Sequence, residues 1–256
     1  MYPNPFEYHR ASSVDEAIAL LQEHGDEAKI IAGGHSLLPT MKLRLANPEH
    51  LIDIATIPAP SGVSEDGAIK QHAPVLGQIA HAIGDRQVRN RGTIGGAIAH
   101  ADPAADYPAG IVALDAELVS VGPDGEHVTP ASDFFVSIFT TALSPDEVLT
   151  AIRVPKAAAK TGMAYEKLPN QASGYAMVGV AAIVTLDPAG KASLVKIGVT
   201  GVADRAFRAE AAEAALTGAA LDSDAVTAAT KDISGDNDVL SDIHASEPYR
   251  RRVADG

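Results

Sequence analysis

Two glycine pairs are the residues of this chain best suited to bind phosphate. Ala32-Gly33-Gly34-His35-Ser36 directly follows an apolar, strand-like stretch, and Thr93-Ile94-Gly95-Gly96 offers a second such segment. Backbone N–H groups that point into one concavity bind phosphate, and glycine lets the chain turn sharply and come close to a ligand. The hydroxyls of Ser36 and Thr93 add donors. Two such loops could together grip the two phosphates of one dinucleotide.

Each glycine pair indicates little by itself, because a Gly-Gly after a strand is most often only a tight turn. Neither segment fits the Rossmann or the P-loop pattern, so both of those phosphate-binding classes are excluded. His100 and Asp102 resemble a metal-binding pair, but no third ligand stands at a suitable spacing, which favours a structural role. We therefore expect no metal site in this chain.

Composition narrows the function classes further. The chain has 256 residues, 46% of them hydrophobic and 21% charged, as in a soluble globular protein. It has no cysteine, which excludes disulfides, iron–sulfur ligation and thiol catalysis by this chain. The net charge of −13 argues against nucleic-acid and anionic-membrane partners. No apolar run is long enough to span a membrane, and the N-terminus lacks the pattern of a signal peptide, so we expect a cytoplasmic protein.

The surrounding pattern predicts the elements that position the two loops. A helix over 13–25 is capped by Ser13 and Glu16, and strands over 29–32 and 51–54 flank the first loop. The remaining expected elements are helices over 70–83 and 106–114, strands over 117–121, 148–154, 163–168, 177–186 and 193–199, and helices over 206–217, 222–231 and 244–254. Strands followed by helices indicate an α+β class. A linker at 155–162 predicts one domain over 1–157, with subdomains of about 1–57 and 58–157, and a second over 158–256.

Longer motifs around both glycine pairs carry a family resemblance. The first runs from Ala32 to Pro39 and continues as Met41-Lys42 and Arg44-Leu45, and the second is Arg91-Gly92-Thr93-Ile94-Gly95-Gly96 followed by residues 99–106. Together they resemble the flavoprotein subunits of molybdenum hydroxylases, the xanthine dehydrogenase family. Similarity is greatest to the medium subunit of aerobic carbon monoxide dehydrogenase. The motif pair is specific for the family but not for the substrate.

The resemblance implies a fold and a set of FAD contacts. The fold is a two-subdomain FAD-binding domain of the vanillyl-alcohol-oxidase (PCMH) type, followed by an α+β domain with a small antiparallel sheet and helices. The implied cofactor-binding residues are Ala32, Gly33, Gly34, His35, Ser36, Leu37, Thr93, Gly95, Gly96, Asp106, Lys167 and Tyr175. Ala97 stands where relatives often carry Asn or Asp, so a side-chain contact is lost there.

Several of these residues have a second interpretation. Asp106 either bonds the ribitol or ribose hydroxyls or caps a helix. The resemblance places Lys167 beside the flavin, where its ammonium would balance negative charge on the reduced ring. Tyr175 either covers a face of the ring or belongs to the core. His35 either donates to the ligand or braces its loop.

The resemblance also implies a role in electron transfer. Electrons from a molybdenum centre on a large subunit would pass through [2Fe-2S] clusters on a small subunit to FAD here, and then to a quinone or other acceptor. The complex would be a dimer of heterotrimers that can lie at the inner face of the membrane through its partners, and this chain would supply no catalytic residue. Carbon monoxide is the favoured substrate. The alternatives are the same subunit in a xanthine, aldehyde or aromatic-heterocycle dehydrogenase, a stand-alone flavin oxidase, and a non-enzymatic assembly protein.

One segment departs from the family pattern. Ser64-Glu65-Asp66-Gly67 has the composition of a hairpin turn, yet only Ala68-Ile69 follows before Lys70 opens the expected helix. Relatives carry an extra strand and the start of a helix here, which takes about 15–20 residues. Either the deletion is real or the 256 residues omit a stretch, and a normal peptide bond between Ile69 and Lys70 favours the deletion. A real deletion would trim the second subdomain and could expose one side of the flavin. The resemblance also implies that the last helix continues beyond Gly256.

Overall fold

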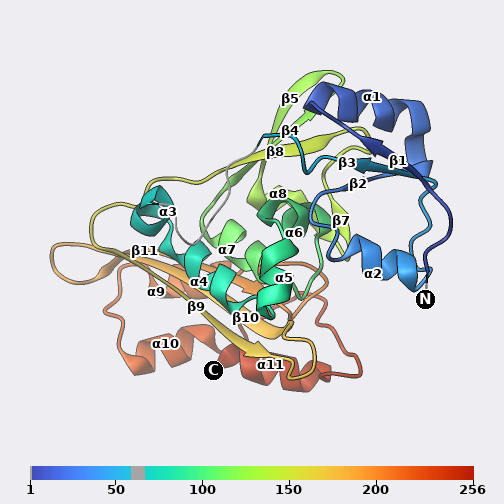
Figure 1. Cartoon of the computed structure of the whole chain (residues 1–256). Helices are drawn as coiled ribbons and strands as arrows, with labels where there is room; N and C mark the ends of the chain where they lie inside the picture. Colours follow the sequence, from blue (N-terminus) through green and yellow to red (C-terminus); the bar gives the residue numbers. More distant parts are fainter. Residues whose placement is uncertain (1, 59–66) are drawn as a thin grey trace.

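The first part of the molecule is a small parallel sheet covered by a helix. The computed structural model describes residues 2–58 and 67–256 (Figure 1). The sheet has the order β1-β3-β2, and its strands are β1 (Glu7–Arg10), β2 (Ala28–Ile31) and β3 (His50–Asp53). Helix α1 (Val14–His24) begins at Ser13, whose side chain accepts the N–H of Glu16, as predicted. A 3-10 turn (Gly25–Glu27) and helix α2 (Leu37–Lys42) complete this part.

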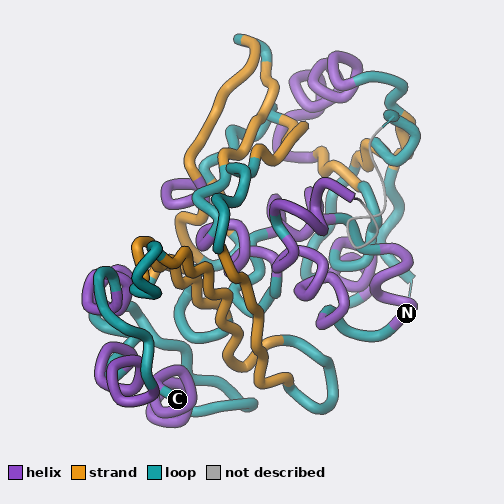
Figure 2. The backbone as a smooth tube through the Cα atoms, turned by 90° about the vertical axis from the view of Figure 1, so that its left-hand side faces the viewer, coloured by secondary structure: helices purple, strands orange, loops and turns teal. Residues whose placement is uncertain are grey.

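An antiparallel sheet of order β5-β4-β8 forms the next part. Its strands are β4 (Glu117–Gly122), β5 (Gly125–Pro130) and β8 (Val148–Arg153). A turn at residues 122–125 joins β4 to β5, and this hairpin projects from the body of the molecule (Figure 2). Short elements follow it, namely α8 (Ala131–Phe134), β6 (Phe135–Ser137) and β7 (Thr140–Thr141).

Five short helices form a layer at the centre of the molecule: α3 (Gly67–His72), α4 (Pro74–Ala82), α5 (Arg86–Arg91), α6 (Ile94–His100) and α7 (Tyr107–Ala113). The single helix expected over 70–83 is wrong, because Pro74 lacks an N–H and begins a new helix. The expected loop at 93–96 is also wrong, since Gly95 and Gly96 lie in the first turn of α6.

The shortened segment is folded as helix α3. Ala73 donates its N–H to the carbonyl oxygen of Ile69 at 2.8 Å, so a helical turn runs through the junction of Ile69 with Lys70. Residues 64–66 of the expected hairpin turn lie outside the described residues, and Gly67 belongs to α3.

The last part is a four-stranded antiparallel sheet with helices on both faces. The strand order is β12-β11-β10-β9, from β9 (Thr161–Pro169), β10 (Ala176–Leu186), β11 (Ala192–Thr200) and β12 (Phe207–Arg208). One face packs on α4 and α7. Helices α9 (Glu210–Leu216), α10 (Ser223–Thr230) and α11 (Glu247–Asp255) lie on the other side (Figure 2). The three predicted strands, the three predicted helices and the α+β class are confirmed, with somewhat different bounds.

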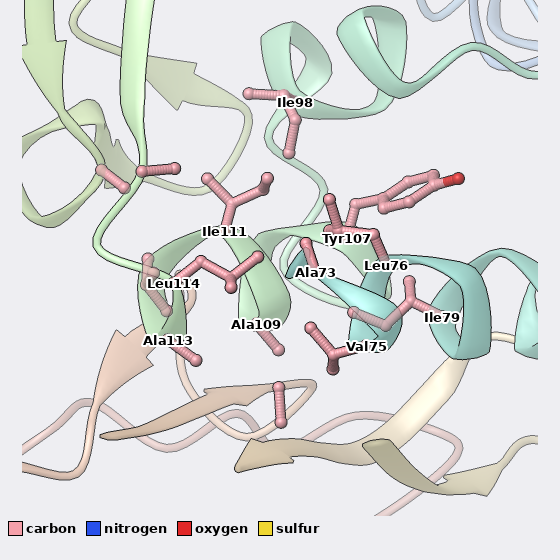
Figure 3. Packing of buried hydrophobic residues seen from close by; sticks show 14 of the residues in the cluster. Ala73, Val75, Leu76, Ile79, Ile98, Tyr107, Ala109, Ile111, Ala113 and Leu114 are labelled. Atoms are coloured by element: carbon pink, nitrogen blue, oxygen red, sulfur yellow. The ribbon is translucent and has the colours of Figure 1, made fainter. Parts of the chain in front are cut away.

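Buried aliphatic side chains join the helical layer to this sheet. Val75, Leu76 and Ile79 of α4 pack with Ile111 of α7 (Figure 3). Helix α7 lies directly on the sheet at Gly198, where a Cβ would come within 2.0 Å of the Ala109 carbonyl oxygen. The start of α7 is thereby held firmly against the C-terminal sheet. Among the described residues, no helix has the length and hydropathy needed to cross a membrane.

Candidate functional site

The two glycine segments meet in the folded chain. Gly33 packs on the backbone of the second segment so closely that a Cβ would lie 1.9 Å from the carbonyl oxygen of Arg91. Gly34 has a φ of 70°, a conformation that favours glycine. Both glycines of the first loop are therefore required by the backbone. The pairing of the two segments, which the sequence only suggested, is a feature of the structure.

Both segments present backbone donors that the protein itself leaves free. Within residues 2–58 and 67–256, the N–H groups of Gly33, Gly34, His35 and Ser36 donate to no protein acceptor. The backbone N–H groups of Ile94 and Gly95, in the first turn of α6, likewise have no carbonyl acceptor within that helix. Free N–H groups on two touching segments form an anion-binding surface.

Thr93 and Gly95 define how open the second segment is. The hydroxyl oxygen of Thr93 accepts the N–H of Gly96 at 3.0 Å, which caps α6 and leaves the hydroxyl hydrogen available. A Cβ on Gly96 would lie 2.6 Å from that oxygen, whereas one on Gly95 would meet no atom within 4 Å. Gly96 is therefore needed for the cap, and Gly95 faces open space where a ligand can lie.

A buried ion pair joins Asp106, just before α7, to Lys167 on β9. Asp106 Oδ1 accepts the Tyr165 hydroxyl at 2.6 Å and pairs with Lys167 Nζ at 2.9 Å. The Asp106 and Lys167 side chains are 6% and 7% exposed. Burial raises the pKa of Asp106, while the Tyr165 hydroxyl and the Lys167 ammonium act in the opposite direction. Burial and the Asp106 charge together raise the pKa of Tyr165, so its hydroxyl stays protonated as a donor.

This pair corrects one interpretation and adds one residue. Asp106 stands at the N-cap position of α7 but makes no capping bond with its side chain, so the helix-capping interpretation is wrong. Tyr165 was not among the expected site residues. The alternation of side chains along β9 could have identified Tyr165. Residues two apart on a strand point to the same face, and Tyr165 is two residues before Lys167.

The Lys167 ammonium links three segments of the chain through hydrogen bonds and an ion pair. Besides Asp106, its ammonium donates to the carbonyl oxygens of Ala82 at 2.6 Å and Gly174 at 2.8 Å. These partners use all three donors of the ammonium group. Gly174 also packs on Gly84, where a Cβ would lie 3.2 Å from the Gly84 Cα. Lys167 thus joins α4, the end of β9 and the loop before β10.

Tyr175 connects this assembly to the first glycine loop. Its hydroxyl lies near the side chain of Ser36; burial, followed by the charge of Asp102, raises the pKa of Tyr175, and the Ser36 hydroxyl acts in the opposite direction. The tyrosine is nevertheless 44% exposed, so the core interpretation of this residue does not hold. His35 is exposed on the same loop, and Leu37 begins α2. The expected residues of both domains thus converge on one region.

His100 and Asp102 have separate structural partners. The His100 ring lies against Phe139 with the centroids 4.9 Å apart. Asp102 Oδ1 accepts the N–H of Ala104 at 2.9 Å and so shapes the turn before Asp106. The structure gives each residue a local role of the kind expected.

Comparison with known proteins assigns the chain to a family. The family model described as the FAD binding domain in molybdopterin dehydrogenase matches residues 4–157. A second, described as the CO dehydrogenase flavoprotein C-terminal domain, matches residues 163–256. The chain belongs to this family of flavoproteins. The resemblance inferred from the two glycine motifs is confirmed, and the chain is an FAD-binding oxidoreductase subunit.

Individual flavoproteins of the family match along almost the whole chain. The carbon monoxide dehydrogenase medium chain of Hydrogenophaga pseudoflava is 41% identical over 272 residues, covering 99% of this chain and 94% of that protein. The 6-hydroxypseudooxynicotine dehydrogenase complex subunit alpha of Paenarthrobacter nicotinovorans is 36% identical over 99% of this chain and 92% of its own length. The alignment spans 272 positions against the 256 residues of this chain, so that relative carries residues that this sequence lacks.

Solved flavoprotein structures agree. A carbon monoxide dehydrogenase structure from Hydrogenophaga pseudoflava superposes with a TM-score of 0.94 at 43% identity, covering 100% of this chain and 95% of the other. Quinoline 2-oxidoreductase from Pseudomonas putida 86 gives 0.90 at 28% identity, with 100% and 94% covered. The FAD-binding domain and the small antiparallel sheet of the second domain are therefore those of the family, and the glycine cradle described above fits such a cofactor.

Proposed function

We propose that this chain is the FAD-carrying electron-transfer subunit of a carbon monoxide dehydrogenase complex. The observation that carries the proposal is the 41% identity to a carbon monoxide dehydrogenase medium chain over 99% of this chain, together with the contact between its two glycine segments. Bound FAD would supply the redox chemistry, because it takes up two electrons and releases them singly or in pairs. The chain itself binds and orients the flavin.

The free N–H groups of the two segments would hold the pyrophosphate. Residues 32–37 form one wall, and Thr93, Gly95 and Gly96 form the other. The first loop has four free N–H groups on consecutive residues, and Gly95 faces open space. A pyrophosphate between them would receive donors from both sides, which matches the two-phosphate geometry of a dinucleotide.

Tyr175 would line the flavin site, and Asp106 and Lys167 would hold Tyr175 in position. The half-exposed Tyr175 ring is able to cover part of the flavin, and its hydroxyl lies near Ser36 of the first glycine loop. Asp106 and Lys167 are almost fully buried, and the ammonium has three partners in the protein. Their effect on a bound flavin would therefore pass through the positions of Gly174 and Tyr175.

The partners in this proposal are a large molybdenum-cofactor subunit and a small [2Fe-2S] subunit, with a quinone or another acceptor receiving the electrons. Full-length similarity to medium chains of multisubunit dehydrogenases supports this arrangement. The second candidate is the same role in a dehydrogenase of an aldehyde or an aromatic heterocycle. The matches to a glyceraldehyde dehydrogenase medium chain at 35% and a nicotine 6-hydroxylase medium subunit at 31% identity favour it.

Purification of the chain with its native partners tests the proposal. The complex is made anaerobic, and flavin absorbance is followed after addition of carbon monoxide, xanthine or an aldehyde. Bleaching by carbon monoxide alone is expected. Bleaching only by one of the other substrates would replace carbon monoxide with that substrate class. A chain that co-purifies with no molybdenum subunit and carries flavin reduced directly by a substrate would contradict the electron-transfer role.

A further inference from the structure

Three histidines of the first sheet and its covering helix come together away from the glycine loops. They are His9 on β1, His24 at the end of α1 and His50 on β3. One ring nitrogen from each lies within 4.8 Å of the others. None of the three was an expected site residue, because they are far apart in sequence and follow no ligand spacing.

The register of the sheet explains the convergence. Strands β1 and β3 are parallel neighbours in which Glu7 lies beside His50. Alternation along β1 places Glu7 and His9 on one face, the face that carries His50. Ile52, two residues after His50, packs under the Ala17, Ile18 and Leu21 side of α1. The helix therefore ends over that face, and Figure 1 shows α1 lying along the small sheet.

The contacts among the rings are close. His9 Nε2 lies 3.0 Å from His50 Nδ1, and the His24 and His50 rings stack with centroids 3.7 Å apart. Imidazole nitrogens bound at 2.0–2.1 Å to one tetrahedral zinc ion lie about 3.3 Å from one another. The broad χ2 torsion of histidine lets each ring turn its nitrogen toward a common point. The backbone has thus brought three imidazoles so close that rotation of the rings can direct one nitrogen of each at a single ion.

We propose that His9, His24 and His50 bind Zn²⁺. Neutral imidazole is a ligand for zinc, whereas magnesium and calcium take oxygen ligands. Three protein ligands leave a fourth position, and Glu7 is the neighbouring carboxylate, with Oε2 3.8 Å from His50 Nδ1. The half-buried setting, in which the His50 side chain is 15% exposed, limits competition from water while leaving the site accessible.

The proposed ion would be structural. It would join the end of α1 to β1 and β3, next to the strand β2 that leads into Gly33. Binding to the folded chain and not to the unfolded one raises thermal stability with zinc concentration. The site is separate from the FAD-binding region, and its test is independent of flavin chemistry.

Zinc titration of the full chain, freed of metal by a chelator, tests the proposal. We expect one Zn²⁺ per chain, measured by competition with a chromophoric chelator and by elemental analysis after dialysis. His24→Gln and His50→Gln should each weaken binding at least about tenfold. The exposed His244 belongs to the C-terminal domain, so His244→Gln should leave binding unchanged. Equal affinity in all four proteins, or no bound zinc in the unaltered chain, would overturn the proposal.

Cobalt substitution gives a measurement that does not depend on how the variants fold. Co²⁺ bound to the unaltered chain in a four-coordinate nitrogen-rich site should give intense visible absorption, which zinc should displace. Only the weak spectrum of hydrated Co²⁺ would contradict the site. The melting temperature of each variant without metal identifies any general loss of folding.

Discussion

Gly33 lies directly against the backbone of Arg91, where a Cβ would be 1.9 Å from the carbonyl oxygen and 2.9 Å from the carbonyl carbon. Gly33 follows β2, and Arg91 is the last residue of α5, just before the second glycine segment. Their contact sets the distance between the two rows of free N–H groups. The proposed pyrophosphate clamp therefore depends on the absence of a single methyl group.

Gly33→Ala should push the two segments apart. Because the obstacle is backbone, it cannot turn away, and overpacking of this kind costs about 1–3 kcal/mol of unfolding free energy. We expect a lower melting temperature and loss of FAD from the purified chain. Gly162→Ala is the matched control, because its Cβ would meet no atom within 4 Å and should change neither property. Normal FAD content in Gly33→Ala would refute the contact's role in the clamp.

Gly95→Ala should separate ligand binding from folding. Its Cβ would meet no protein atom within 4 Å, and alanine favours the helical first turn where Gly95 lies by up to about 1 kcal/mol. The melting temperature of the flavin-free chain should hold or rise, while FAD affinity, measured by fluorescence titration, should fall. Unchanged affinity would mean that the open side of Gly95 does not face the cofactor.

Lys167→Met should destabilise the chain strongly. It leaves the buried Asp106 carboxylate without its cation and frees two carbonyl oxygens, at a cost of about 3–5 kcal/mol in urea unfolding. Adding Asp106→Asn should recover part of that loss, because the unpaired charge is removed. Lys196→Met is the control, since its partner Asp115 is 53% exposed and such pairs contribute less than about 1 kcal/mol. Equal losses for both lysines would contradict the burial argument.

The ionisation of Asp242 should make the free energy of unfolding depend on pH. Burial alone would raise its pKa, but the N–H groups of Ala245 and His244 and the Arg250 guanidinium lower it below the ordinary 3.8. The folded chain therefore gains stability above the unfolded pKa and loses it as the pH falls through the folded pKa. Relative to the unaltered chain, Asp242→Asn should lose about 1 kcal/mol at neutral pH. That gap should close below about pH 4.

Thermal unfolding between acidic and neutral pH measures that gap. The exposed Asp236 provides the control. The melting temperature of Asp236→Asn should stay at a constant difference from that of the unaltered chain at every pH. A gap between Asp242→Asn and the unaltered chain that stays constant into acid would show that the carboxylate's charge is not its source.

The sequence predicted the elements with strong local signals. Ser13 and Glu16 located the start of α1, and the strand expected over 117–121 is found as β4. It failed where local signals conflict with packing. Glycine indicates a loop, yet Gly95 and Gly96 open a helix because Thr93 caps it. Pro74 divides a stretch whose hydrophobic pattern favours one helix.

The resemblance named residues for the candidate site, but the sequence could not give their geometry. The resemblance named Asp106, Lys167 and Tyr175, yet nothing local indicates that Lys167 is buried or that Ser36 lies near Tyr175. The histidine cluster was missed for a related reason. His9 and His50 meet only through the pairing of β1 with β3, which no short sequence pattern encodes.

Titration of the purified, flavin-free chain with FAD tests the central claim most directly. Bound flavin is read from its visible absorbance and from the quenching of its fluorescence, with Gly33→Ala alongside. The account predicts one FAD per chain for the unaltered protein and little or none for the variant, while Gly162→Ala matches the unaltered chain. A chain that is folded but takes up no FAD at any ratio would contradict it.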